Sequence, residues 1–338
     1  MPKNLYQRGG VYYARIQVSG AERRVSLKTA DRREAERRLK VFLAENSPYH
    51  GTIRRSFDDV VGDFLDEASS RLKPKTLKRY EVSAIQLGNK FSGKWWDSVT
   101  KRAVVEYIDE RKAEGAKIPT IRRDLTVLSQ AAEWAIERGI GGVNPVDELG
   151  KRQLRYKKPT FIRPSEQSIE ETINAAYGNL KPLARFLRHT GMRLDEAATL
   201  RLDAIDRARK VATLHDTKSR RSRAVALTDE ALACLPDTGE YAFPSRNGEP
   251  YKQASTNWQE AKARARKSAQ KEGWRYTPFR LHDLRHIYAI EYLANGGNLY
   301  ALQRQLGHGT IRQTEEYLQY LSPEEAKLAI DRSAQNPA

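Results

Sequence analysis

The most informative stretch of the chain reads Leu306-Gly307-His308-Gly309-Thr310-Ile311-Arg312-Gln313-Thr314-Glu315-Glu316-Tyr317. It places a histidine directly after a Leu-Gly pair and a tyrosine nine residues beyond that histidine. Three further strings precede it: Thr190-Gly191-Met192-Arg193-Leu194-Asp195-Glu196, then Thr217-Lys218, then Leu281-His282-Asp283-Leu284-Arg285-His286. Each string alone is a weak signal, but their order and context together indicate one shared site.

Together, the four strings resemble the phage-integrase family of tyrosine recombinases. That family carries, in chain order, an arginine, a hairpin lysine, a His-x-x-Arg motif, a histidine in Leu-Gly-His and a tyrosine nine residues later. The matching catalytic residues of this chain are Arg193, Lys218, His282, Arg285, His308 and Tyr317, with Glu196 at the supporting acidic position. The sequence departs little from the pattern, although Gly309 stands where a small polar residue is commoner.

Two arginines of this set suit the stabilisation of a phosphodiester under attack. As the phosphorus becomes five-coordinate, negative charge gathers on the non-bridging oxygens, to which planar guanidinium groups can donate paired hydrogen bonds. Arg193 lies in a Gly-containing turn before an expected helix, while His282 and Arg285 share one face at a helix start. We therefore expect both arginines to converge on one phosphate, with His282 and His308 adding a hydrogen bond or moving a proton.

Tyr317 is the predicted nucleophile and Lys218 the predicted general acid. A phenol has a reference pKa of about 10, so Tyr317 needs cationic neighbours to react near neutral pH. The displaced 5′-hydroxyl of deoxyribose is a poor leaving group unless it is protonated, and a lysine at a hairpin tip can supply that proton. The phosphotyrosyl bond keeps the energy of the diester, so a second 5′-hydroxyl can reseal the DNA without ATP. Glu196 is expected to orient Arg193.

Several nearby residues compete for these roles. Tyr320 is close to Tyr317 but fails the spacing, and Lys210 precedes a strand instead of lying between two strands. The pair His282-Asp283 hints at a metal phosphohydrolase, but further metal-ligand spacing is absent from the sequence, so we expect no metal ion or other cofactor. Four other residues are interpreted as structural: His189, His215, His286 and the single cysteine, Cys234.

The charge of the chain predicts a nucleic-acid partner. The 338 residues include 60 Lys and Arg against 43 Asp and Glu, which leaves a net charge of +17 and a pI of 9.8. The net charge is +6 in residues 1–50, +6 in residues 51–158 and +5 in residues 159–338, so each of these three parts of the chain is basic. We expect several domains to contact the phosphate backbone. On charge alone, a generally basic soluble protein remains the alternative.

Residues 1–50 are predicted to form an arm-type DNA-binding domain. Alternation over residues 11–18 and a second run over 23–27 predict a β-hairpin, and a helix is expected from Asp31. A basic β-ribbon of this kind can lie in a DNA groove. The strand arginines expected to contact DNA are Arg15, Arg23 and Arg24. A small structural cap with solvated charges explains this segment equally well.

Residues 51–147 are predicted to form a helical core-DNA-binding domain, because four stretches show apolar spacing of three and four. The second of these helices opens on a basic turn that suits phosphate binding. Its expected DNA contacts are Lys73, Lys75, Lys78 and Arg79. Residues 148–160 form a basic linker that is expected to cross the DNA backbone through Lys151, Arg152, Arg155, Lys157 and Lys158.

Residues 161–338 are predicted to form the catalytic domain with a C-terminal tail. They are mostly helical, apart from a second hairpin over residues 211–215 and 223–227 with Lys218 between its strands. The fold class is therefore mainly α with small β-hairpins. Because the chain has no apolar run approaching 18 residues and no signal-like N-terminus, we expect a cytoplasmic protein without a membrane partner.

The resemblance implies a site-specific DNA recombinase, and among these a phage or mobile-element integrase. It implies that the substrate is double-stranded DNA attachment sites, on which a homo-tetramer joins two duplexes and exchanges C-terminal tails between protomers. DNA-bending accessory proteins are further partners that the resemblance allows. Three alternatives stay open: a chromosome-dimer resolvase, a type IB topoisomerase and a catalytically silent DNA-binding regulator. The basic domain at residues 1–50 disfavours the resolvase, and the intact residue set disfavours the silent regulator.

Overall fold

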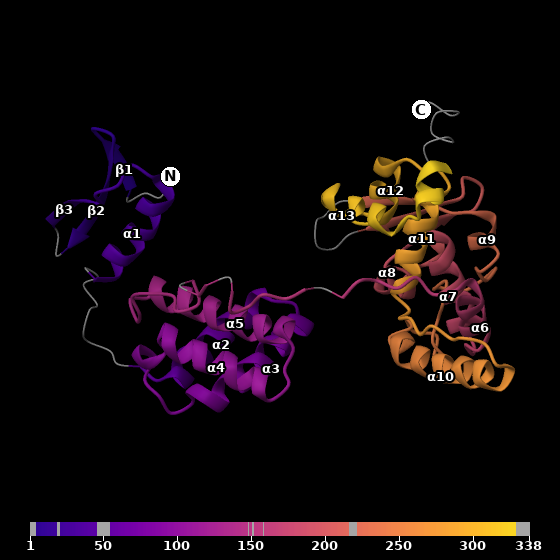
Figure 1. Ribbon diagram of the computed structural model, residues 1–338, viewed down its shortest axis with the longest axis horizontal. Helices are drawn as coiled ribbons and strands as arrows, with labels where there is room; N and C mark the ends of the chain where they lie inside the picture. The colour runs from indigo at the N-terminus through magenta and orange to yellow at the C-terminus, as the bar shows by residue number, and fades with distance from the viewer. Residues whose placement is uncertain are drawn as a thin grey trace. The chain divides into compact units, whose positions relative to one another are not determined.

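The computed structural model describes residues 5–18, 21–45, 55–147, 149–150, 152–157, 159–215 and 222–328. The chain divides into two compact units, Met1–Pro159 and Thr160–Ala338. Helices dominate both, and the described part of each unit contains one three-stranded antiparallel sheet (Figure 1). The predicted fold class, mainly α with small β elements, is confirmed. The finer division into domains ending near residues 50, 147 and 160 stays a prediction.

The first unit begins with a small sheet and one helix. Its elements are β1 (Leu5–Arg8), β2 (Val11–Val18), β3 (Ala21–Ser26) and α1 (Arg32–Glu45). Asp31 caps α1, because its carboxylate accepts a hydrogen bond from the Glu34 backbone N–H at 2.8 Å. The strand β1 was not predicted; it turns into β2 through Gly9 and Gly10, both at positive φ. These elements share a core of Leu5, Tyr12, Ala14, Leu27, Ala35 and Leu39.

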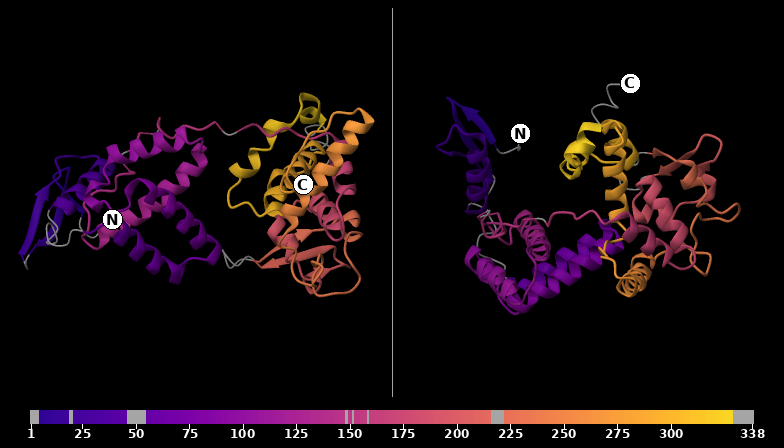
Figure 2. Two further views of the ribbon diagram at one scale, coloured as in Figure 1. Left: turned by 90° about the horizontal axis from the view of Figure 1, so that it is seen from below. Right: turned by 45° about the vertical axis from the view of Figure 1, so that its right-hand side comes forward.

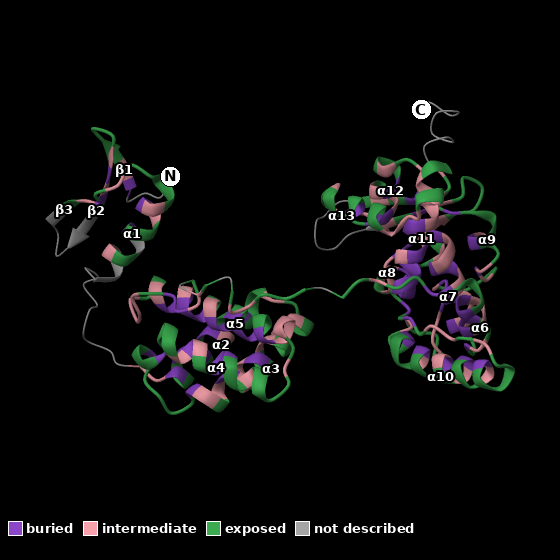
Figure 3. Cartoon of the chain, in the orientation of Figure 1, coloured by how far each residue is buried: buried purple, intermediate pink, exposed green. Residues whose placement is uncertain are grey.

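Four helices follow in the same unit. They are α2 (Phe57–Arg71), α3 (Pro74–Phe91), α4 (Lys101–Ala113) and α5 (Ile118–Glu137), with a short 3-10 turn η1 (Trp96–Ser98) before α4. Ser56 and Asp59 form a capping box at the start of α2. The buried residues of these helices form one core around Phe57, Phe64, Phe91 and Leu128, coloured purple in Figure 3.

Asn144, just before the predicted linker, and Leu154 within it both contact α5. Asn144 is 4% exposed, and its amide donates to the Ser129 hydroxyl at 2.9 Å and to Glu133 at 3.0 Å. Further along, a guanidinium nitrogen of Arg122 donates to the carbonyl of Leu154 at 2.6 Å. Asn144 and Leu154 therefore belong to the first unit.

The second unit is a helical body with a sheet along one side. Its helices are α6 (Glu166–Asn174), α7 (Leu180–Thr190), α8 (Leu194–Ala198), α9 (Asp229–Leu232), α10 (Ala254–Glu272), α11 (Asp283–Ala294), α12 (Leu299–Leu306) and α13 (Arg312–Glu315). Its sheet contains β4 (Ile205–Asp206), β5 (Val211–His215) and β6 (Ser222–Ala226), and its 3-10 turns are η2 (Leu202–Ala204) and η3 (Leu318–Tyr320).

Helices α7 and α11 pack against each other in the middle of this unit. Figures 1 and 2 show α10 at one end of the unit and α12 with α13 at the other. The main core includes Phe186, Phe243, Trp258 and Leu284, and a second cluster formed by α11, α12 and the following segment includes Tyr317. The predicted site residues that the structure describes in this unit thus lie where the ends of α7, α11 and α12 approach one another.

Within the described ranges, no helix is both long and apolar enough to cross a membrane.

Candidate active site

Gly191 brings the end of α7 close to α11 and α12. It ends α7 with φ at +65°, a left-handed conformation that glycine adopts without a steric penalty. A Cβ built on it would lie 2.4 Å from the Tyr288 ring and 2.8 Å from Leu306. No larger residue fits at this position, so the helix ends can meet here and the next residues can carry the first arginine into the site.

Arg285 is held inside that junction. Its residue is only 4% exposed, and its guanidinium donates to the carbonyls of Gly191 and Leu306, both at 2.8 Å. Burial, with a contribution from the charge of Arg193, lowers its pKa to about 10. The group still carries its positive charge near neutral pH, and its two carbonyl partners fix the plane of the guanidinium.

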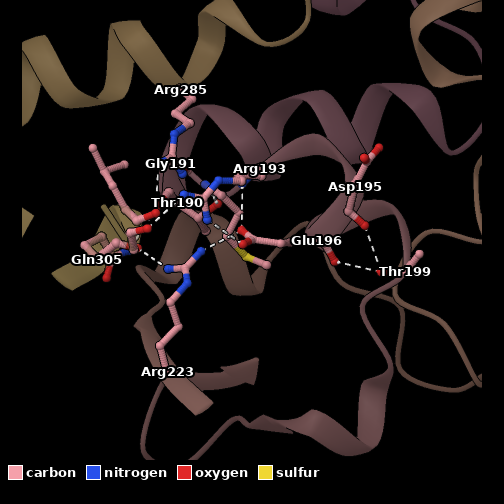
Figure 4. Close-up of polar contacts among 12 residues, drawn as sticks. Thr190, Gly191, Arg193, Asp195, Glu196, Thr199, Arg223, Arg285 and Gln305 are labelled. Atoms are coloured by element: carbon pink, nitrogen blue, oxygen red, sulfur yellow. Dashed lines mark hydrogen bonds and ion pairs between the residues drawn. The ribbon is translucent and has the colours of Figure 1, made fainter. Parts of the chain in front are cut away.

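Arg193 lies beside it at the N-terminus of α8. It donates to the Glu196 carboxylate at 2.9 Å and to the carbonyl of Gly307 at 2.8 Å, yet its side chain is 43% exposed. The backbone N–H of Arg193 donates to the same carboxylate at 2.9 Å. The two arginines therefore bind adjacent carbonyls at the end of α12, those of Leu306 and Gly307, and Figure 4 shows part of this network.

Arg223 on β6 completes the cluster, although no sequence motif marks it. It donates to Glu196 at 2.6 Å and also to the carbonyl of Gln305 (Figure 4). The Gln305 side chain accepts a hydrogen bond from the backbone N–H of Ala226 at 2.9 Å and donates to the carbonyl of Ala226 at 3.0 Å. It also donates to the carbonyl of Thr190 at 3.1 Å. The hairpin strand is thereby attached to both α8 and α12. In the sequence, Arg223 is an ordinary strand position in a basic segment, so it was not predicted as a site residue.

Gly307 gives a direct test of this packing. Its φ is +66°, and a Cβ there would lie 2.6 Å from Nε of Arg223. Gly307→Ala should therefore destabilise the second unit by roughly 2–4 kcal/mol, from left-handed strain plus disturbed charged hydrogen bonds. Urea unfolding measures the loss of stability. The matched control is Gly309→Ala, because no atom lies within 4 Å of a Cβ at that position. Equal losses of stability for the two variants would contradict the packing.

Tyr317 follows α13 and is 5% exposed. Its hydroxyl lies 3.1 Å from Nδ1 of His286, and its ring stacks on that of His308 with centroids 6.1 Å apart and planes 13° apart. Burial raises the pKa of Tyr317, while the charge and hydrogen bonding of Arg285 oppose the rise. Tyr320 instead packs edge-on against Phe161, with centroids 5.7 Å apart.

The site histidines are neutral near pH 7. Burial and the neighbouring arginines lower the pKa of His308 to about 4, and its Nδ1 is bonded to the buried Thr314 hydroxyl at 2.9 Å. Partial desolvation, followed by the charge of Arg285, also lowers the pKa of His282. The positive charge among the described site residues therefore comes from arginine side chains.

The structure brings together six predicted residues: Arg193, Glu196, His282, Arg285, His308 and Tyr317. Lys218, in the segment between β5 and β6, lies outside the described residues. Lys151, Lys158 and the side chain of Arg23 also lie outside them. The other predicted DNA contacts are exposed: Arg15, Arg24, Lys73, Lys75, Lys78, Arg79, Arg152, Arg155 and Lys157. The rival Lys210 is paired with Asp229 at 2.7 Å.

Most of the second unit matches a known protein family. Residues 165–322 match the model of the phage integrase family. The integrase of Escherichia phage P2 is 29% identical over 234 residues, which cover 69% of this chain and 64% of that integrase. The matched stretch thus spans slightly less than two thirds of that relative.

Two solved structures share the fold. One is a lambda integrase dimer bound to a COC′ core site, with a TM-score of 0.66, 19% identity and coverage of 94% of this chain and 95% of the other. The second is a lambda integrase tetramer bound to a Holliday junction, with a TM-score of 0.64, 19% identity and coverage of 92% and 96%. The segment of residues 165–322, which carries the site described above, therefore belongs to the phage integrase family.

Proposed function

We propose that this protein is a site-specific DNA recombinase that integrates or excises a phage or other mobile element through a 3′-phosphotyrosyl intermediate. The observation that carries the proposal is the placement of Tyr317, whose hydroxyl lies in a buried cluster beside Arg285, His286 and His308. A lone packing tyrosine needs no such surroundings. A phenol that must attack a phosphate needs fixed cations close by.

In the proposed reaction, Arg193 and Arg285 stabilise charge on the non-bridging oxygens of the scissile phosphate. The bonds to Gly191, Leu306 and Gly307 orient both guanidinium groups before DNA arrives, so little reorganisation is needed during the reaction. Glu196 keeps Arg193 in place from one side. The exposed part of Arg193 is where the phosphate would enter.

Tyr317 attacks the phosphorus, and the bond from phosphorus to the 5′-oxygen breaks. Lys218 is proposed to protonate the departing oxygen, while His282 and His308 donate hydrogen bonds to the phosphate. Because the new link is itself a phosphodiester, a second 5′-hydroxyl can displace the tyrosine and rejoin the strand. The reaction so written requires neither a metal ion nor ATP.

The proposal is tested by trapping the intermediate. A nicked duplex carrying the attachment site loses its short 5′-hydroxyl strand after cleavage, so that the covalent adduct accumulates. Denaturing electrophoresis in EDTA should show the adduct, and mass spectrometry of the digested protein should find the modification on Tyr317 at a 3′-phosphate. Absence of an adduct on a verified site, or attachment to another residue, would refute the proposed chemistry.

The family resemblance also supports a homo-tetramer on two duplexes with tail exchange. One of the solved structures with this fold is a lambda integrase tetramer bound to a Holliday junction. Residues 1–50 are proposed to bind separate arm sites. Their Arg15 and Arg24 are paired across β2 and β3, which concentrates basic charge on one ribbon.

Deleting residues 1–50 should weaken binding to long attachment DNA and leave cleavage of a short core duplex intact. The deletion removes a net charge of +6, so the salt dependence of binding should become shallower, by about 0.9 in log–log slope for each phosphate that the protein no longer neutralises. Titrations at several salt concentrations measure the slope. Equal weakening on long and short DNA would show that the segment serves the core clamp or the fold.

A further inference from the structure

His286 contacts the reacting atom of the proposed nucleophile. Its Nδ1 lies 3.1 Å from the Tyr317 hydroxyl oxygen, within hydrogen-bond distance. His308 relates to the same phenol differently, because its ring lies nearly parallel to the Tyr317 ring and its Nδ1 is bonded to Thr314. A stacked ring presents its face, whereas His286 presents a ring nitrogen.

The position of the His286 ring is fixed from several sides. It lies in the first turn of α11, directly after Arg285, whose two carbonyl bonds anchor that turn. The His282 ring meets it edge-on, with centroids 5.4 Å apart and planes 89° apart, and Phe161 packs on it with centroids 5.4 Å apart. The nitrogen is therefore held toward the phenol by packing as well as by the hydrogen bond itself.

We propose that His286 is the general base that takes the phenolic proton of Tyr317 during DNA cleavage. This assignment rests on the proposed function of Tyr317. As the bond from Oη to phosphorus forms, the Oη–H bond breaks and its proton moves to Nδ1, while the departing 5′-oxygen receives a proton from the separate general acid. In rejoining, His286 returns its proton to Oη as the tyrosine leaves.

The protonation states suit this direction of transfer. The pKa of His286 is lowered to about 4, first by burial and then by His282, so the imidazole is neutral near pH 7 and one of its ring nitrogens carries no proton. The pKa of Tyr317 is raised, so its phenol starts protonated and requires a base. The titratable and charged groups around the His286 ring are Asp283 and Arg285 of α11, Arg280 and His282 before it, Tyr317 after α13, and His308 after α12.

The test replaces His286 by asparagine, which places an acceptor oxygen near the position of Nδ1 but cannot take a proton. The substrate carries sulfur in place of the bridging 5′-oxygen, so that departure of the leaving group needs no acid and nucleophile activation limits the rate. His286→Asn should form the adduct about 10²–10⁴-fold more slowly than the wild type at pH 7. Its rate should rise roughly tenfold per pH unit as the solution supplies the base. The wild-type rate should stay nearly flat.

The matched control is His189→Asn, the same change at a half-buried histidine of α7 outside this cluster, which should cleave like the wild type. Melting temperature and DNA binding show whether each variant is folded. If His286→Asn is not folded, His286→Gln is used in its place. A wild-type rate and pH profile for His286→Asn would overturn the inference, even if His286→Ala were slow, because a hydrogen bond alone would then suffice. Adduct mapping on the wild type decides the role of Tyr317 independently of these outcomes.

Discussion

Tyr317→Phe should abolish the covalent protein–DNA adduct and leave binding of attachment DNA intact. The substitution removes only the hydroxyl that is proposed to attack the phosphorus. The ring that packs against His308 stays in place, so the arginine cluster should keep its geometry. Adduct formation on the nicked substrate is followed by denaturing electrophoresis, and DNA binding by native gel retardation of the same duplex.

The control for this prediction is Tyr320→Phe. Tyr320 lies three residues further along and packs on Phe161 rather than on the site histidines. The Tyr320→Phe variant should therefore form the adduct at close to the wild-type rate. An adduct that persists in Tyr317→Phe and disappears in Tyr320→Phe would exchange the roles of the two tyrosines.

Arg285→Ala should slow adduct formation by about 10³-fold or more, and sulfur at the bridging 5′ position should not restore the rate. The side chain is proposed to stabilise charge on the non-bridging oxygens, and this role does not depend on the leaving group. Loss of one such hydrogen-bond donor typically slows a reaction about 10²–10³-fold, and this substitution removes a positive charge as well. The change also leaves the carbonyls of Gly191 and Leu306 without this donor, so the variant should unfold at a lower temperature. Rates are therefore compared below its unfolding transition.

Lys218→Ala gives the contrast that makes the Arg285 result interpretable. It should cleave the ordinary substrate about 10²–10⁴-fold more slowly, because the departing oxygen lacks its acid, yet recover most of its rate on the sulfur substrate. Arg193→Ala should behave like Arg285→Ala. If sulfur rescues His282→Ala or His308→Ala while Lys218→Ala stays slow, the general acid is a histidine.

The sequence predicted the helical elements well, because their caps and apolar periods are local. Asp31 marks a helix start by its own chemistry, and the structure places it at the expected end of α1. The strand β1 was missed, since its four residues are too few to show an alternation. The docking of Asn144 and Leu154 on α5 was missed as well, because it depends on partners that are distant in sequence.

For the site, the motifs predicted which residues gather but not how they are held. Glu196 was expected to support Arg193, and the structure shows its carboxylate also binding Arg223. Nothing local distinguishes Arg223 from the other arginines of its basic segment. His286 was interpreted as structural, because the sequence does not show that α11 turns its ring toward Tyr317. The two residues are separated by 31 positions, and the approach of such distant segments is decided by the packing of whole helices.

The bonds of Arg223 and Gln305 make the pairing register of β5 and β6 matter for the site. Leu214 faces Arg223 in the observed register, and Arg223 then reaches Glu196 and the end of α12. Successive residues of a strand point to opposite faces, so a slip of one residue would turn Arg223 away and present Ala224 or Ser222 to the carboxylate. The same slip would separate Ala226 from Gln305. The pairing register of β5 and β6 therefore decides whether Arg223 can hold Glu196, the carboxylate that supports Arg193.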